Sequence, residues 1–318
     1  MNARCGLYDP ADEKDSCGVG MVVRVDGSKG HDIVEMGLKT LENLAHRGAE
    51  NADGRTGDGS GITIQIPHEF ILKCGVKVPE SGRYGTGLIF LPKDAERAEG
   101  CMSVFREECD SLGLTMLAER EVPVDHSVPG PLALETEPAI RQVFISSYDG
   151  QEELERKLFL LRKHSERKNE DEDFYICSLS TKTIVYKGML TPRQIRDYYL
   201  DLSDEDLKSS IAMVHSRFST NTTPMWKLAQ PFRKLCHNGE INTIKANRSW
   251  MSARESILRS KVFPDIPDIS PIVQPGMSDS ASLDNVFEFL TLSGLSMSNI
   301  GLLKERLPRL CSFWQLRG

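Results

Sequence analysis

The sequence lacks the features that mark membrane, secreted and metal-binding proteins. No apolar run approaches the roughly 20 residues of a membrane-spanning helix. Residues 1–16 are polar and charged and contain no apolar segment of a secretory signal. The eight cysteines include no C-x-x-C pair, and the seven histidines form no metal-spaced pairs with them. These absences argue against a disulfide framework and predict reduced thiols in the cytoplasm, without a bound metal.

Positive charge is also scarce. The 39 lysines and arginines are outnumbered by 46 aspartates and glutamates, which gives a net charge of −7. This balance argues against nucleic acid or an anionic membrane as a partner. Hydrophobic residues make up 39% and charged residues 27%, as in an ordinary soluble protein. A chain of 318 residues forms one large domain or two small ones.

The hydrophobic pattern alternates strands with helices. Strands are predicted over 17–25, 62–66, 84–91, 142–148 and 174–179, and helices over 31–46, 93–112, 151–168, 242–258 and 281–294. The alternation within 62–66 predicts a strand with one solvent-exposed face. The charge run 162–173 predicts a solvated helix end and its loop, and 264–275 predicts a proline-rich loop. Together these elements predict helices packed on stacked sheets.

The most informative stretch is HSRFSTNTTPMWKLAQPFRKLCHNGEINT, residues 215–243. Arg217 follows an apolar strand, and its guanidinium is suited to clamp a substrate carboxylate. Asn238 and Gly239 follow the apolar segment 232–236, a second predicted strand. Their side-chain amide and backbone N–H are suited to stabilise an oxyanion. Alternatively, Arg217 forms a surface ion pair, and the Asn-Gly pair forms a type I′ hairpin turn.

A nucleophile candidate stands near the start of the chain. Cys17, in Asp-Ser-Cys-Gly-Val-Gly, precedes the apolar residues 21–23. A thiolate is intrinsically nucleophilic, although a free thiol has a pKa of about 8.5. Alternatively, Cys17 is a buried and inert cysteine. The tryptophans Trp226 and Trp250 are predicted to pack in the core or a pocket wall, since the net charge disfavours a base-stacking role.

Several motifs occur in one order along the chain. They are CGVG at 17–20, HRGA at 46–49, the glycine-rich segment 53–62, the two segments within 215–243, and MSDSASLD at 277–284. This set resembles the class II glutamine amidotransferase domain, from about residue 7 to 299. More narrowly it resembles the N-terminal glutaminase domain of the glutamate synthase large subunit. The strings TGDGSGI, LAQPFRKLCHNGEINT and SDSASLDN favour glutamate synthase in particular.

The resemblance implies an α+β fold, the four-layer αββα sandwich of the N-terminal-nucleophile hydrolases, over 17–299. It implies that residues 1–16 are a removable propeptide. Removal would place the α-amine of Cys17 beside its sulfur, where it can act as base. Alternatively, residues 1–16 are a flexible terminus.

The same resemblance assigns roles to the other site residues. Asn238 and Gly239 match the oxyanion donors. Arg217 and Asp279 match the residues that hold the α-carboxylate and α-amino groups of glutamine. Arg47 matches an arginine close to the nucleophile; alternatively it is a cation at a helix C-terminus beside Gly48. The glycines of 57–61 are predicted to turn the backbone tightly near the site, because a phosphate-loop spacing is missing.

The implied activity is glutamine hydrolysis to glutamate and ammonia. The ammonia would pass to 2-oxoglutarate in a separate synthase domain or subunit. FMN and an iron–sulfur cluster would belong to that absent part, and no cofactor is expected in this chain. Residues 300–318 do not resemble the family and suggest a truncation or a reading-frame shift, which would leave the sandwich incomplete. The alternatives are an inactive fragment or binding partner, and the glutaminase of another class II amidotransferase.

Overall fold

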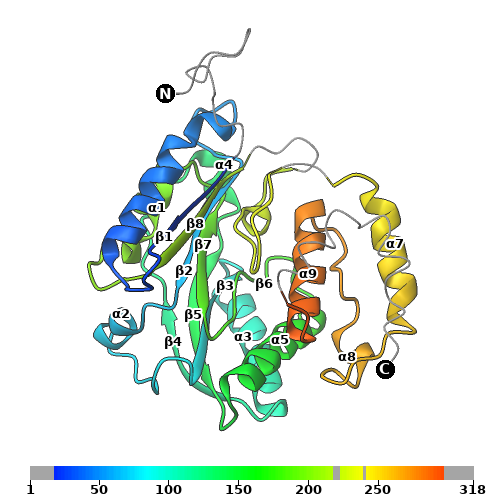
Figure 1. Cartoon of the computed structure of the whole chain (residues 1–318). Coiled ribbons are helices and arrows are strands. Elements are labelled where there is room, and N and C mark those ends of the chain that lie inside the picture. The colour runs from blue at the N-terminus through cyan, green and yellow to red at the C-terminus, as the bar shows by residue number, and fades with distance from the viewer. Residues whose placement is uncertain (1–17, 218–222, 239–240, 297–318) are drawn as a thin grey trace, which may run out of the picture.

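The computed structural model describes residues 18–217, 223–238 and 241–296 (Figure 1). The proposed propeptide, Cys17, Gly239 and the tail 300–318 therefore lie outside the described residues.

Two four-stranded antiparallel sheets form the centre of the molecule. In the first sheet the strands run in the order β1 (Val19–Val23), β8 (Ile211–Ser216), β2 (Ser60–Gln65), β7 (Thr183–Gly188). Helix α1 (His31–Asn43) covers its outer face, and the short turn η2 (Ala45–Arg47) follows. Helix α1 approaches strand β8 closely because Gly37 has no side chain. A Cβ atom at Gly37 would lie 2.5 Å from the Cβ of Ala212.

In the second sheet the strands run in the order β4 (Thr115–Glu121), β5 (Ala139–Ser146), β3 (Tyr84–Leu91), β6 (Tyr175–Ile176). Helices α3 (Ala95–Ser111) and α5 (Gln151–Lys168) cover its outer face, where Ile89 and Val143 pack with Phe105 and Leu158. The layers therefore follow one another as helix, sheet, sheet, helices (Figure 1). Short helices and turns lie in the connections: α2 (His68–Lys73), α4 (Pro131–Glu135), α6 (Gln194–Tyr198), η3 (Leu200–Ser203), η4 (Trp226–Leu228).

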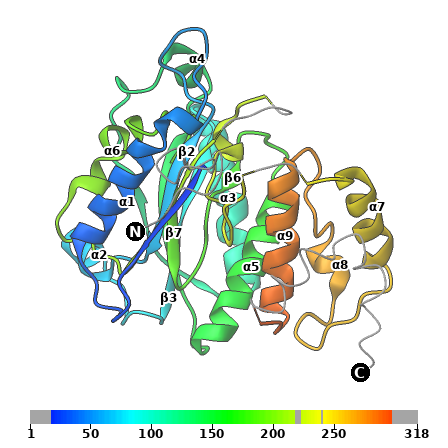
Figure 2. The same ribbon diagram turned by 45° about the horizontal axis from the view of Figure 1, so that its top comes forward.

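The last three helices are α7 (Ile244–Glu255), α8 (Ile266–Ile269) and α9 (Asp279–Leu292). Of these, α9 and α8 lie beside α5, and α7 lies farther out (Figure 2). A separate apolar cluster joins them, in which Phe159 of α5 packs with Met251 of α7, Ile269 of α8 and Phe289 of α9. This cluster packs the C-terminal half of α9 with α5, α7 and α8, whereas Ala281 at the start of α9 belongs to the main core.

Much of the predicted element order is confirmed. The helix predicted over 151–168 is α5 with the same bounds, and β3 has the predicted bounds 84–91. Asp279 is the first residue of α9. Cys74, Cys101, Cys109 and Cys177 are free thiols. Strands β4 and β7 were not predicted.

The solvent exposure predicted for one strand is wrong. β2 has no solvent-exposed face, since five of its six residues are buried and Gln65 is partly buried. It is a central strand, with α1 against one face and the second sheet beyond the other. Ile62 lies within reach of Gly37 of α1, and Thr63 on the opposite face is also buried. The alternation of threonine and glutamine with isoleucine in β2 therefore does not indicate a solvent-exposed face.

Three further predictions are corrected. The charge run 162–173 is not simply solvated, since Arg162, Lys163 and His164 are buried against the C-terminal helices. Segment 232–236 is not a strand; it forms an irregular loop between Gln230 and His237. Trp226 is in the core as expected, but Trp250 on α7 is 54% exposed.

Candidate active site

The end of β8 brings together three motifs that are far apart in the sequence. The Ser216 N–H donates to the Gly18 carbonyl at 2.8 Å, and the Arg217 N–H donates to the Gly59 carbonyl at 2.8 Å. The Ala49 N–H donates to the Arg217 carbonyl at 3.3 Å. The CGVG, HRGA and TGDGSG segments are therefore all attached to the backbone of two adjacent residues.

Two glycines permit this close approach. A Cβ atom added to Gly48 would lie 2.6 Å from Ser216 Oγ. Gly59 has a φ of +133°, and an added Cβ would lie 2.9 Å from the Cβ of Ala229. Side chains other than hydrogen are strained or excluded at both positions. The expected tight turn beside the site is present.

Arg217 is buried at the end of β8 and is not a surface residue. Its Nη1 donates to the Asp58 carbonyl at 3.3 Å. Burial lowers the pKa of Arg217, whereas the negative charges of Asp58 and Asp279 raise it. Because a guanidinium remains charged at all physiological pH values, the position holds a buried cation with Asp279 close enough to influence it.

Asn238 lies beside the start of β1. A Cβ atom added to Gly18 would lie 3.2 Å from Asn238 Oδ1 and 2.4 Å from the Ser216 carbonyl oxygen. The residue that follows Cys17 is thus in contact range of the predicted oxyanion donor. Asn238 itself is exposed, so a substrate can reach its amide.

The side chain of Gln230 holds the backbone next to Asn238. Its Oε1 accepts from the His237 N–H at 2.9 Å, and its Nε2 donates to the His237 carbonyl at 3.0 Å. The imidazole Nδ1 of His237 lies 3.0 Å from Ser280 Oγ. These bonds replace the strand pairing that the sequence had suggested for this segment.

Asp279 begins α9. Ser278 caps the helix, its Oγ accepting from the Ala281 N–H at 3.2 Å. The Asp279 carboxylate accepts from the N–H groups of Ser280 and Ile241, both at 2.7 Å. A carboxylate at a helix N-terminus is favoured by the helix dipole and by the unpaired N–H groups of the first turn. Asp279 is therefore held in place beside the loop of Asn238, by which we mean the described residues 230–238 and Ile241.

Arg47 is the last residue of η2, directly before Gly48. The contact of Gly48 with Ser216 brings η2 to the same end of β8. Of the site residues predicted from the sequence, the structure places Arg47, Arg217, Asn238 and Asp279 near the end of β8. Gln230 and Ser280 were not identified. Ser280 stands beside Asp279 in the SDSAS string, but no local pattern indicated a partner for Gln230.

Two buried basic side chains of the first sheet, His215 and Lys187, lie close enough to Arg217 for its charge to lower their pKa, in addition to the larger effect of burial. Burial lowers the pKa of His215 on β8 to about 3, so its imidazole is neutral at pH 7. Burial also lowers the pKa of Lys187 on β7 to about 7. Its Nζ lies 4.8 Å from the ring centres of both Tyr175 and Phe232 and donates to the Lys227 carbonyl at 3.0 Å.

Metal and membrane signals are missing from the part of the chain that the structure describes. Within 18–217, 223–238 and 241–296, no three His, Cys, Asp or Glu side chains cluster closely enough to hold a metal ion. No helix in these ranges has the length and apolar character needed to cross a bilayer.

The arrangement suits a small zwitterion. A buried guanidinium offers paired donors to a carboxylate, and a carboxylate near it offers acceptors to an ammonium group. The amide side chain of Asn238 lies next to the start of β1. A molecule that carries both charges at one end and a carbonyl at the other could span these groups.

Comparison with known proteins supports one family. The family model of the class II glutamine amidotransferases matches residues 17–303. A glutamate synthase (NADH) of Schizosaccharomyces pombe is 46% identical over 303 residues, which cover 91% of this chain and 14% of that protein. The glutamate synthase (NADPH) large chain of Bacillus subtilis is 45% identical over 297 residues, covering 91% of this chain and 20% of that protein.

A third relative is ferredoxin-dependent glutamate synthase 2 of Synechocystis. It is 40% identical over 293 residues, which cover 90% of this chain and 19% of that protein. The chain thus spans between 14% and 20% of the length of these relatives.

Proposed function

Because this chain belongs to the class II glutamine amidotransferases, we propose that it hydrolyses L-glutamine to glutamate and ammonia, with Cys17 as the nucleophile. The observation that carries the proposal is the position of Gly18, which lies between Ser216 and Asn238 at the end of β8. The layer order of helix, sheet, sheet and helices supports the further proposal of an N-terminal-nucleophile hydrolase sandwich.

Removal of residues 1–16 would expose the α-amine of Cys17. This amine, with an ordinary pKa of about 8, would accept the thiol proton while the sulfur attacks the carboxamide carbon of glutamine. Negative charge then develops on the carbonyl oxygen. The Asn238 side chain and the Gly239 N–H would donate to it, in the role predicted from the sequence.

The tetrahedral intermediate would collapse to a thioester. The C–N bond breaks, and the protonated α-amine returns its proton to the leaving nitrogen, which departs as ammonia. Water would then add to the thioester, assisted by the same amine, and release glutamate with the thiol restored. Both half-reactions use the same base and the same oxyanion donors.

Binding of the amino-acid end is assigned to two charged residues. Arg217 would hold the α-carboxylate, since its guanidinium is buried and rigidly placed by its own backbone bonds. Asp279 would accept from the α-ammonium group. Arg47, at the end of η2, would lie close to the nucleophile. Analogues of glutamine that lack the α-carboxylate or the α-ammonium group should therefore be hydrolysed slowly.

The relatives are named glutamate synthases, and we propose the same context for this chain. The ammonia would pass to a synthase domain or subunit that forms glutamate from 2-oxoglutarate. In this proposal FMN and the iron–sulfur cluster belong to that synthase part. The alternative is a fragment that binds glutamine without turnover.

Glutaminase assays combined with N-terminal sequencing test the proposal. Active material should begin at Cys17, and Cys17→Ala should abolish ammonia release from glutamine. Matched controls are Cys74→Ala and Cys109→Ala, which change a free thiol that is exposed and one that is buried away from β8. Active enzyme that retains residues 1–16 would exclude the α-amine of Cys17 as the base, and a Cys17→Ala variant with full activity would exclude Cys17 as the nucleophile.

A further inference from the structure

The first turn of α9 contacts the loop of Asn238 on both sides of that residue. Ser280 Oγ lies 3.0 Å from His237 Nδ1, directly before Asn238. The Asp279 carboxylate accepts from the Ile241 N–H at 2.7 Å, three residues after it. The helix that carries the proposed ammonium-binding residue is therefore joined to the loop that carries the proposed oxyanion donor.

One turn further along α9, Asp284 forms a third junction with the same loop. Its Oδ1 accepts from the Lys234 N–H at 2.8 Å, and its Oδ2 accepts from the Arg233 N–H at 3.4 Å. The Arg233 guanidinium also lies 3.9 Å from Oδ2. Asp284 has an exposed fraction of 0%, so water cannot replace these donors. One carboxylate thus holds two consecutive peptide groups of a loop that has no strand partner.

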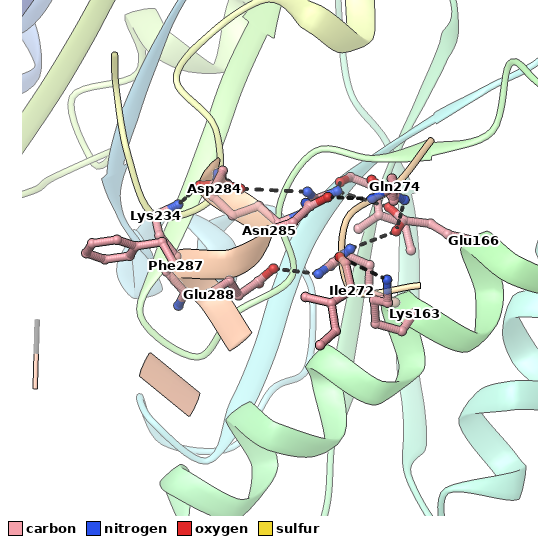
Figure 3. A network of polar contacts seen from close by, with 12 residues as sticks. Lys163, Glu166, Lys234, Ile272, Gln274, Asp284, Asn285, Phe287 and Glu288 are labelled. Atoms are coloured by element: carbon pink, nitrogen blue, oxygen red, sulfur yellow. Dashed lines mark hydrogen bonds and ion pairs between the residues drawn. The ribbon is translucent and has the colours of Figure 1, made fainter. Parts of the chain in front are cut away.

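Helix α9 is itself anchored to α5 by buried ion pairs (Figure 3). Glu288, one turn beyond Asp284, pairs with Arg162 of α5. Arg162 pairs with Glu166 at 2.7 Å, and Glu166 pairs with Arg233 at 3.0 Å. Glu288 accepts its hydrogen bond from Arg162 of α5, whereas Asp284 accepts from the loop. The charge of Glu288 also acts on Arg233 and Asp284, but it supplies no acceptor to the N–H groups of Arg233 and Lys234.

The energetic cost of this arrangement argues that it has a geometric role. Burial and the neighbouring Glu288 raise the pKa of Asp284, while Arg233 and the Lys234 N–H lower it. Buried ion pairs commonly contribute little net stability, because desolvation offsets their attraction. A buried carboxylate does, however, fix the positions of the donors that surround it.

We propose that Asp284 is a positioning residue of the glutamine site, which fixes the loop of Asn238 relative to α9 and Asp279. This inference rests on the proposed function for its kinetic consequence, although the junction itself is structural. Without the junction, α9 would remain on α5 through Glu288. The loop would keep its contacts through Glu166 and Gln230, but its Arg233 and Lys234 N–H groups would lose their acceptor. The oxyanion donor would then be misaligned while Arg217 and Asp279 still bound the substrate.

The test compares two isosteric substitutions one turn apart on the same helix, made in the full chain. Asp284→Asn keeps one acceptor but presents an NH₂ group to the backbone donors. Glu288→Gln removes an equally buried charge that contacts α5. For each variant, kcat and KM for glutamine, the melting temperature, and hydrogen exchange of peptides covering 230–241 are measured.

We expect Asp284→Asn to lower kcat on the order of 10- to 100-fold, because a misplacement of about 1 Å can cost about 100-fold. Its KM should change by less than about threefold, since uniform binding is retained. Exchange of 230–241 should accelerate. Glu288→Gln should change kcat by less than about twofold and leave that exchange unaltered, even with a similar loss of melting temperature.

Equal losses of kcat and equal exchange in the two variants would overturn the proposal, because they would indicate only a general loss of packing. Unchanged kcat and exchange in Asp284→Asn would also overturn it. If the unmodified chain releases no ammonia from glutamine, the proposed function fails. Exchange alone then decides the positioning role, by whether 230–241 opens in Asp284→Asn and stays closed in Glu288→Gln.

Discussion

Replacing Gly18 with alanine should move the start of β1 away from the loop of Asn238. The added methyl group would lie 2.4 Å from the Ser216 carbonyl oxygen, which is backbone and held in the sheet. This is roughly 1 Å closer than ordinary van der Waals contact. Relief therefore requires a shift of about 1 Å at the residue that follows the proposed nucleophile.

A shift of this size predicts the kinetic effect. Displacing a reacting group by about 1 Å can cost about 100-fold in rate. We expect kcat of Gly18→Ala to fall by roughly that factor, while KM for glutamine changes little because Arg217 and Asp279 are undisturbed. Overpacking should also lower the free energy of unfolding by about 1–3 kcal/mol.

Gly20→Ala is the matched control on the same strand. A Cβ atom there would lie 2.5 Å from Thr40 Cγ2 and 3.1 Å from Val214 Cγ2, on the face toward α1. It should cost similar stability without approaching Asn238. Ammonia release is measured at saturating glutamine and divided by the fraction of chains that begin at Cys17, taken from intact mass. This correction separates catalysis from propeptide removal.

Equal kcat values for the two variants, after this correction, would refute the reasoning. They would mean that contact between the start of β1 and the loop of Asn238 has no bearing on the chemistry. A loss confined to KM would also contradict it, because that would indicate a disturbed carboxylate or ammonium site.

Three further predictions concern Asn238, Arg217 and Lys187. Asn238→Ala should lower kcat by roughly 10²–10³ with a smaller effect on KM for glutamine; unchanged steady-state kcat would leave Asn238 only a turn-forming role. Arg217→Lys should raise KM roughly tenfold or more, since an ammonium cannot reproduce a bidentate fork, and calorimetric glutamine affinity equal to the parent's would argue against the clamp. Lys187 has a folded pKa of about 7 and an unfolded pKa of about 10.4. The unfolded chain therefore binds more protons between these values, and the free energy of unfolding should rise with pH across this window. Urea denaturation at pH 7 and 9.5 should show a smaller rise for Lys187→Met, and the same rise in both proteins would contradict the burial effect.

The sequence predicted correctly the elements whose pattern of apolar and polar residues matches the burial of those residues in the fold. Helix α5 was predicted with its observed bounds because apolar residues recur along one stripe and polar residues flank it. Arg217, Asn238 and Asp279 were predicted as site residues because each lies in a distinctive string. The structure places all three near the end of β8, although Gly239 and Cys17 lie outside the described residues.

Two of the failures share one physical cause, which is that polar residues can be buried when a distant partner satisfies them. Arg162 belongs to a charge run that suggested solvent, but its partner Glu288 stands 126 residues away. The alternating threonine and glutamine of β2 suggested a wet face, yet a second sheet covers that face. A single sequence gives the polarity of each residue and not the identity of the group that pairs with it.

The loop of Asn238 shows why such distant partners matter for the site. Its apolar residues suggested a strand, and its backbone donors must be paired in the interior. The Gln230 side chain and the carboxylate of Asp284 supply acceptors that a neighbouring strand would otherwise provide. Since these partners are side chains, the loop can leave the sheet plane and bring Asn238 over Gly18. A strand at this position would instead take its backbone partners from a neighbouring strand, and the place of Asn238 would not depend on Gln230 and Asp284.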